Sequence, residues 1–220
     1  IANIQSGSFH DMFIGDYFQI NGSNYVIAGI NTKHLHGDNM QLGNHLLLMP
    51  DRFSKSEDGT VLRSNGKDTH YMNDTDTTAG GFAGTKLYKT IMPSIQKKLE
   101  ADFGNHLLNF REVVSTHVDD NGAPDQAEWR DAKLGIPNEV MIYGTTLNGN
   151  NKNGSWYNIG DDDTQLPLFR LDPNEITNHR DWAFWLRDIH SASGFAFACD
   201  GGGASWGGAS DPWRGVRAFF

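Results

Sequence analysis

The pattern of apolar and polar residues near the start of the chain predicts a β-hairpin followed by a buried strand. Two β-prone runs, residues 14–20 and 25–28, flank a short loop that contains Asn21 and Gly22. An Asn-Gly pair between such runs is a strong signal for a hairpin turn. Residues 44–49 then bring a short apolar run, which is typical of a buried strand.

The clearest helical pattern covers residues 85–103. Four apolar side chains recur there at intervals of four residues and would form one stripe along a helix: Leu87, Ile91, Ile95 and Leu99. Pro93 interrupts the stripe, so we expect either a kink or two short helices with Pro93 in the first turn of the second. Gly104 and Asn105 are expected to end the helix.

The middle of the chain carries weaker patterns. Residues 107–114 suggest a strand, residues 126–134 a second helix, and residues 138–142 a shorter helix. Two segments are rich in polar residues and glycine and are expected to be loops: 54–66 and 148–163.

The last part of the chain is more apolar and richer in small residues. Residues 182–186 are strand-like, and residues 193–197 alternate small and aromatic side chains as a strand does. Residues 200–214 are almost entirely Gly, Ala, Ser, Asp and Trp and are expected to be loop, while residues 216–220 suggest a closing strand. Because no fixed-period repeat and no linker is visible, we expect residues 1–220 to form one domain.

Composition and charge narrow the classes of function. The chain has 25 glycines and 11% aromatic residues, which favours a turn-rich fold with many short strands. Its formal charge of −9 argues against nucleic-acid and membrane-surface partners, which need clustered Lys and Arg. No apolar run is long enough to span a bilayer, and no signal peptide is visible at the start. Cys199 is the only cysteine, so it forms no intrachain disulfide and no cysteine-based metal cage.

Residues 201–214 hold the most informative set of side chains. Trp206, Asp211, Trp213 and Arg214 stand on a backbone with little other side-chain bulk. Trp and Arg are enriched at binding hot spots, and glycine lets the backbone approach a ligand closely. Two interpretations stay open: a binding surface, or a loop whose tryptophans fold back onto the core.

Metal sites are weakly supported. His34 and His36 are two residues apart, a spacing that would place both on one strand face, and His45 and His70 follow. No HExxH or comparable ligand motif is present, so structural roles are the better interpretation. The acidic runs 73–76 and 161–163 offer oxygen ligands but lack the spacing of an EF-hand loop, so solvated turns are expected.

Catalysis has no positive support in the sequence. Cys199 would need an orienting partner such as His179 or His190, and no local signature of a cysteine nucleophile surrounds it. No Gly-x-Ser-x-Gly elbow, phosphate loop or Gly-x-Gly-x-x-Gly is present either. We therefore expect a protein that is not an enzyme and that uses neither a cofactor nor a metal.

The C-terminal segment, residues 184–220, resembles C-type-lectin-like domains of bacterial surface proteins and of tail or receptor-binding proteins of phages that infect gut bacteria. The resemblance rests on the following residues: 184–193, Phe195, Ala196, Gly202, Ala204, Ala209, Ser210 and 215–217. Upstream pieces extend it over nearly the whole chain: 14–18, 44–51, 72–73, 87–88, 92–93 and 166–170.

The same segment looks like the variable region of proteins diversified by retroelements, in which a fixed scaffold presents rewritten positions. The resemblance assigns the scaffold to Trp185, Leu186, Arg187, Ser191, Ala192, Ser193, Phe195, Ala196, Gly202, Ala204, Ala209, Ser210, Gly215, Val216 and Arg217. It assigns the displayed, ligand-contacting positions to His190, Gly194, Phe197, Cys199, Asp200, Gly201, Gly203, Ser205, Trp206, Gly207, Asp211, Trp213 and Arg214. Tryptophan does not arise from an Asn codon by adenine changes alone, so Trp206 and Trp213 depart from the pattern. Ala218, where many relatives carry proline, also departs from it.

The fold that the resemblance implies is α+β: a small twisted antiparallel core sheet, two helices and neighbouring termini. The implied function is a receptor-binding or adhesin module on a phage tail or bacterial surface, with a cell-surface protein or glycan as partner and a homotrimer as one arrangement. Calcium-dependent sugar binding is not implied, because Ile136-Pro-Asn138 lacks the leading acidic residue and no Trp-Asn-Asp follows. Two alternatives remain: a structural subunit of a virion or fibre, and an enzyme on the scaffold of formylglycine-generating oxidases, whose chemistry needs two cysteines.

Overall fold

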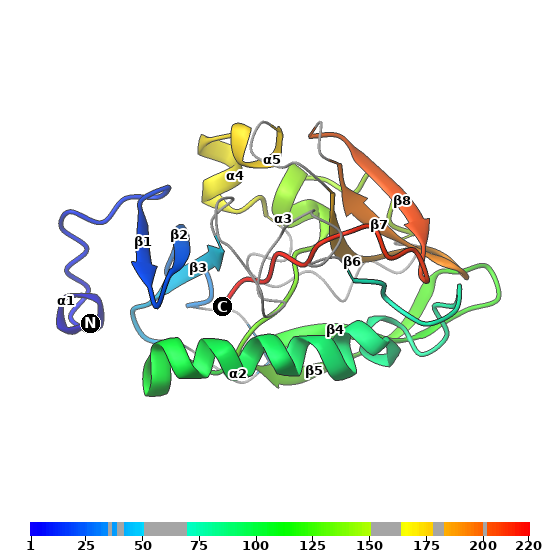
Figure 1. Ribbon diagram of the computed structural model, residues 1–220, viewed down its shortest axis with the longest axis horizontal. Coiled ribbons are helices and arrows are strands. Elements are labelled where there is room, and N and C mark those ends of the chain that lie inside the picture. Colours follow the sequence, from blue (N-terminus) through cyan, green and yellow to red (C-terminus); the bar gives the residue numbers. More distant parts are fainter. Residues whose placement is uncertain (35–36, 39–41, 51–69, 151–163, 178–182, 200–201) are drawn as a thin grey trace.

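Three small antiparallel sheets and a few helices make up the fold (Figure 1). The computed structural model describes residues 1–34, 37–38, 42–50, 70–150, 164–177, 183–199 and 202–220. The α+β class predicted from the sequence is confirmed. The predicted loop at 54–66 and most of the one at 148–163 lie outside the described residues.

The first sheet has the order β1-β2-β3 and contains the predicted hairpin. Strands β1 (Tyr17–Ile20) and β2 (Ser23–Ile30) are joined by Asn21 and Gly22, whose φ angles are 48° and 82°. Positive φ at both positions matches the right-handed twist of the strands, and Asn and Gly tolerate it. Strand β3 (Leu46–Pro50) pairs with β2 and is mostly buried, as its apolar run predicted.

The helical prediction for residues 85–103 is confirmed in its main features. One π-helical turn, η2 (Leu87–Ile91), leads into α2 (Met92–Phe103), and Pro93 lies in the first turn of α2. Gly104, with φ of 57°, ends the helix. Three residues of the predicted stripe are buried: Leu87, Ile95 and Leu99.

The second sheet corrects the prediction of a helix at 126–134. Strand β4 (Phe110–Val118) pairs antiparallel with β5 (Pro124–Ala132) along most of their length. In β5, Gln126 and Glu128 are exposed while their neighbours are half-buried. A strand with one open face accepts polar residues at alternate positions, and pairing with β4 outweighs the helical propensity of the segment.

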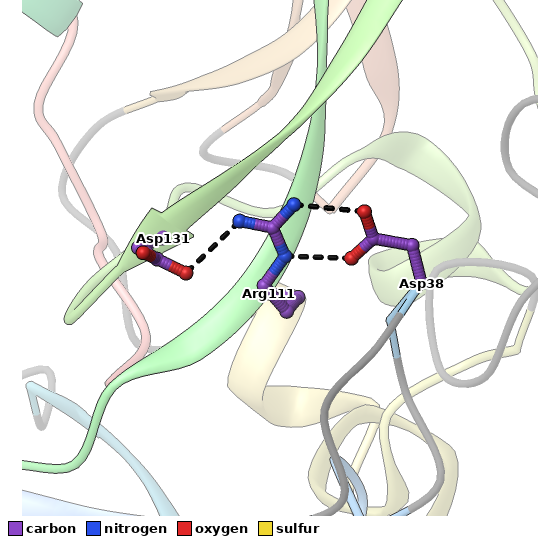
Figure 2. A network of polar contacts seen from close by, with 3 residues as sticks. All are labelled: Asp38, Arg111 and Asp131. Carbon is purple, nitrogen blue, oxygen red and sulfur yellow. Dashed lines mark hydrogen bonds and ion pairs between the residues drawn. The ribbon is translucent and has the colours of Figure 1, made fainter.

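An arginine clamp fixes the segment between β2 and β3 to this second sheet (Figure 2). Arg111 of β4 donates from Nε and Nη2 to the two carboxylate oxygens of Asp38, at 2.6 and 2.8 Å, and from Nη1 to Asp131 of β5 at 2.9 Å. Gly37 has φ of 113°, and a Cβ there would lie 2.6 Å from Cβ of Arg111. Glycine therefore permits the close approach of this segment to β4.

The third sheet has the order β6-β7-β8 and is formed by the C-terminal part of the chain. The strands predicted at 182–186 and 193–197 correspond to β6 (Phe184–Ser191) and β7 (Gly194–Ala198). Strand β8 (Ala204–Gly208) lies where a loop was expected. Both faces of the sheet pack into core, one through Trp185, Ile189, Phe195 and Phe197, the other through Phe184, Leu186, Ala196 and Ala198.

Short helices fill the spaces between the sheets. Asn138 caps α3 (Glu139–Tyr143) through a bond from Met141 N, which confirms the helix predicted at 138–142. The remaining short helical turns carried no prediction of their own: α1 (Ala2–Gln5), η1 (Phe82–Gly84), η3 (Gly104–His106), α4 (Pro167–Leu171) and α5 (Asn174–Thr177).

The C-terminal tail, residues 215–220, crosses the middle of the molecule and pairs with three separate segments (Figure 1). Gly215 exchanges backbone bonds with Trp185 and Ala183 beside β6, at 3.0 and 2.9 Å. Phe219 exchanges two bonds with Gly135, and Phe220 exchanges two with Leu48 of β3. The predicted closing strand is thus a series of isolated bridges rather than one continuous ladder.

Among the described residues, one buried ion pair joins two sheets and another joins the C-terminal tail to α5. Arg187 of β6 lies 2.5 Å from Glu112 of β4, with both side chains at most 1% exposed. Arg217 of the tail lies 2.6 Å from Glu175 of α5 and donates a second bond to the backbone oxygen of Glu175. Burying such charges is unfavourable unless both partners are present, so each pair depends on its partner.

We expect Arg217→Ala to lower the free energy of unfolding by about 3–5 kcal/mol, because it leaves the Glu175 carboxylate buried without its cation. Urea denaturation measures this loss. Arg170→Ala, at an exposed position of α4, is the matched control and should change the free energy by less than about 0.5 kcal/mol. A similar small loss for Arg217→Ala would contradict the structural role of the pair.

Candidate functional site

A pair of stacked aromatic rings, one exposed and one half-buried, lies on the third sheet. The imidazole of His190, in β6, and the indole of Trp206, in β8, have centroids 4.3 Å apart and an interplanar angle of 13°. Trp206 is 47% exposed, although the rest of this sheet is largely buried. We call His190 and Trp206 together the aromatic platform.

Small residues of β7 allow Trp206 to reach across the sheet to His190. Trp206 pairs with Ala196 in the β7–β8 ladder, and Gly194 lies two residues away on the same face. A Cβ on Gly194 would lie 3.2 Å from Cε3 of Trp206 and 2.6 Å from the backbone oxygen of Gly207. The stacking of Trp206 on His190 therefore requires small side chains on β7, the strand between them.

His190 is oriented by a loop from the middle of the chain. Its Nδ1–H donates to the carbonyl oxygen of Asn148 at 2.7 Å, since a carbonyl can only accept. The next residue but one, Asn150, donates its backbone N–H to Ile189 O at 2.6 Å. The loop Leu147–Asn150 thus runs along the end of β6 and holds one member of the platform.

A buried carboxylate holds this loop in place. The side chain of Glu139, at the start of α3, accepts backbone N–H bonds from Leu147, Asn148 and Gly149, each at 2.8 Å. Glu139 is 0% exposed. Three N–H groups converging on one charged acceptor form a strong, charge-assisted arrangement, so the loop is fixed from within rather than by solvent-facing contacts.

A second buried carboxyl group lies beside the first. Asp188 of β6 accepts the backbone N–H of Glu139 at 2.7 Å and is 4% exposed. Burial, together with the nearby charge of Glu139, raises the pKa of Asp188 to about 7. This carboxyl group therefore changes its charge in the neutral pH range, directly beneath the loop that holds His190.

Arg214 packs against the opposite face of the sheet. Trp206 and Gly207 are consecutive in β8 and point to opposite faces, and a Cβ on Gly207 would lie 2.7 Å from Nη2 of Arg214. The guanidinium group lies over the ring of Phe197 at 3.7 Å and forms an ion pair with Asp211. The arginine is thus turned inward, where its charge is paired with that of Asp211.

The other predicted display positions fall into several environments. Trp213 is exposed to 60%, and its backbone N–H donates to Asp211. Gly203 is exposed with open space around it, and Ser205 is half-buried. Gly194, Phe197 and Gly207 are buried. Asp200 and Gly201 lie outside the described residues.

Cys199 lies in a turn away from His190. Its backbone N–H donates to Gly203 O, while Gly203 O also accepts the hydroxyl of Tyr143 at 2.6 Å. Burial, then the neighbouring Cys199 and Glu139, raise the pKa of Tyr143. His190 is bonded to Asn148 and stacked on Trp206, so the structure does not bring Cys199 and His190 together as a nucleophile and base, and His179 lies outside the described residues.

The remaining histidine and acidic candidates have structural roles where they are described. His34 lies in a turn after β2, so its prediction on a strand face is wrong, and His36 lies outside the described residues. His45 uses both ring nitrogens, on Lys33 N and Gly43 O. Asp74 pairs with Lys86, Asp76 accepts from Ser210, and residues 161–163 are not described. Burial lowers the pKa of His70, whose backbone pairs with Arg214.

Sequence reasoning did not single out Glu139, Asn148 or Asp188 as functional residues. Glu139 and Asp188 are 49 positions apart in the sequence, and Asn148 and His190 are 42 positions apart. None belongs to a spaced motif, so only the three-dimensional fold reveals the group. The one visible signal was the weaker pattern at residues 138–142, which predicted α3.

An apolar cavity of about 490 Å³ lies at the end of the molecule that holds the first sheet. Its walls include Phe18, Ile27, Leu48, Phe103 and Phe220. Asp102, which also lines it, is already bonded to Asn21, Tyr25 and Lys98. The cavity is therefore chiefly a hydrophobic surface whose carboxylate is satisfied internally.

Comparisons with protein-family models, with curated proteins and with solved structures found no match. Within the described part of the chain, no helix is long and apolar enough to cross a membrane. The same residues contain no group of three or more His, Cys, Asp or Glu side chains placed to hold a metal ion.

We expect Gly194→Ala to destabilise the domain by about 1–3 kcal/mol, because the added methyl group meets the backbone of Gly207 and the indole of Trp206. Gly203→Ala is the matched control, since nothing lies within 4 Å of its Cβ position. Thermal or urea denaturation of both variants measures the difference. Equal stability of the two would show that β7 and β8 separate more easily than their packing indicates.

Proposed function

We propose that this protein is a non-enzymatic binding module in which the aromatic platform contacts a protein or glycan receptor on a cell surface. The observation that carries the proposal is the 47% exposure of Trp206 in a sheet whose other large apolar side chains are buried. A large exposed aromatic residue on a rigid support is typical of a binding hot spot.

The rigid support adds to the proposal. Trp206 stacks on His190, His190 is held by Asn148, and Asn148 is held by buried Glu139. A side chain fixed in this way loses little conformational entropy when a ligand binds. The indole is therefore prepared for contact rather than folded back as a core residue.

The fold supports assignment to the C-type-lectin-like domains of phage receptor-binding and bacterial surface proteins. The small antiparallel sheets and the C-terminal sheet that carries the platform support this assignment, whereas the described residues contain one long helix, α2, where the resemblance implies two. Ile1 and Phe220 line the same cavity, so the two ends of the chain lie near each other, as such domains require. A phage tail or bacterial surface is accordingly the proposed location.

A structural subunit of a virion or fibre is the second candidate. Exposed apolar side chains at the cavity end, namely Ile1, Tyr17 and Leu108, favour contact with another chain, as in a homotrimer. Tyr17 lies in β1, Ile1 precedes α1 and Leu108 follows η3. Trp206, by contrast, lies on the third sheet. Assembly and receptor binding would therefore use different ends of the molecule.

We expect Trp206→Ala to weaken receptor binding by about 1–4 kcal/mol while leaving the melting temperature nearly unchanged. Binding is measured with labelled protein on bacterial cells and on an immobilised glycan panel. Leu171→Ala, at a 67% exposed position of α4, is the matched surface control. If Trp206→Ala instead breaks an oligomer or lowers the melting temperature by many degrees, the platform is a subunit contact or a core element.

Sequencing the locus across a natural population tests the diversified display that the resemblance implies. The structure refines the expected pattern, because open positions accept new side chains and packed glycines do not. We expect variation at Gly203, Ser205, Trp206 and Trp213, constant glycine at Gly194 and Gly207, and a neighbouring template repeat with a reverse transcriptase gene. An invariant segment without a template would indicate a fixed adhesin or a structural subunit.

A further inference from the structure

We propose that the buried pair Glu139 and Asp188 couples proton binding to the aromatic platform, so that the platform is ordered in mildly acidic solution and loosened in alkaline solution. The inference rests on the proposed function for its biological meaning, because it assigns a regulation to that same ligand site. Its physical basis is a continuous chain of contacts from Asp188 to Trp206.

The first step of the chain is the contact between the two carboxyl groups. Asp188 accepts the backbone N–H of Glu139, and a Cβ on Gly149 would lie 3.0 Å from Cβ of Asp188. Asp188 thus contacts both the start of α3, which carries Glu139, and the loop residue Gly149, which Glu139 holds. A charge that appears on Asp188 acts on both at short range and with little screening by water.

The charged and titratable groups around Asp188 come from four elements. Glu139 and Tyr143 belong to α3, Arg187 and His190 flank Asp188 on β6, and Glu112 of β4 forms the ion pair with Arg187. Cys199 follows β7 and lies near Tyr143. Glu112 lies 2.5 Å from Arg187. The positive charge of Arg187 is therefore already paired with Glu112 when Asp188 ionises.

The direction of the effect follows from the raised pKa of Asp188, which is about 7 because of burial and the charge of Glu139. A carboxyl group with a raised pKa in the folded state favours folding fully at low pH, and this contribution is lost as the pH rises through about 7. Below that value Asp188 is neutral and the Glu139 carboxylate holds the loop. Above it, two adjacent negative charges are buried together.

The repulsion is relieved most easily at the loop. Glu139 can move away from Asp188 only by releasing the N–H groups of Leu147, Asn148 and Gly149. Release of Asn148 removes the carbonyl that orients His190, and His190 is the ring on which Trp206 stacks. Ionisation of Asp188 therefore loosens the platform without unfolding the core.

The test uses the isotope-labelled full chain without any ligand. By NMR, we expect the backbone amides of Leu147, Asn148 and Gly149 and the indole N–H of Trp206 to titrate with a shared midpoint of about 7. Hydrogen-exchange protection of the three amides, corrected for the intrinsic rate, should fall by up to about tenfold for each pH unit between about 4, the ordinary pKa of a carboxyl group, and that midpoint, and should level off above it. Amides of α2 serve as the internal reference and should keep their protection.

Two variants distinguish the titration of Asp188 from that of His190, because histidine side chains ordinarily titrate in the same pH range. Asp188→Asn keeps an acceptor for the Glu139 N–H and should abolish the titration of the three amides, whereas His190→Phe keeps an aromatic ring and should preserve it. Glu139→Gln, which removes the neighbouring charge, should move the midpoint to lower pH. Persistence of the titration in Asp188→Asn, or its loss in His190→Phe, would overturn the proposal.

This test can refute the proton-linked control without refuting the proposed function, and the reverse also holds. All of its signals come from the protein alone, whereas the proposed function depends on the loss of receptor binding in Trp206→Ala. Lost binding in Trp206→Ala with pH-independent amides would leave a binding module without this control. Titrating amides with unchanged receptor binding would leave a proton-linked loop and remove the platform from the ligand site.

Discussion

Backbone pairing of the C-terminal tail is the constraint on which the rest of the structure depends. Residues 215–220 form bonds with β6, with Gly135 and with β3, and thereby connect the first and third sheets, which share no strand. Arg217, in the middle of the tail, adds a buried ion pair with Glu175. Each sheet has only two or three strands, and such small sheets need partners for stability. The tail supplies them to two sheets at once.

Local signals in the sequence predicted those elements whose structure is decided locally. Asn21-Gly22 predicted the hairpin, the four-residue stripe with Pro93 and Gly104 predicted α2, and a weaker pattern at residues 138–142 predicted α3. The helix expected at 126–134 was wrong because pairing with β4 decides the structure of β5, and that pairing is invisible in the segment itself. Strand β8 was missed for a related reason: its Gly and Ser residues have low β-propensity, and β7 provides the ladder.

In the candidate site, too, residue type was visible in the sequence while the arrangement of the side chains was not. Trp206 and Trp213 stood out by composition, and both are exposed. Arg214 stood out equally, yet it faces the other side of the sheet, because one step along β8 reverses the direction of a side chain. The support of the platform by Glu139 and Asn148 came only from the fold. Residue type thus indicated which side chains can bind, while strand register decided which of them face outward.

The pairing of Phe220 with Leu48 has a consequence for how the chain folds. The bonds of Gly135 to Phe219 and of Leu48 to Phe220 close loops of 84 and 172 residues, the differences between the paired residue numbers. Contacts so distant in sequence slow folding, since the entropy of closing these loops is lost before the pairing energy is gained. Until residue 220 has been synthesised, the strand edge at Leu48 remains open to pairing with other chains. A nascent chain would therefore be most prone to aggregation just before synthesis of this region is complete, and a chaperone that shields β3 during that interval would increase the yield of folded protein.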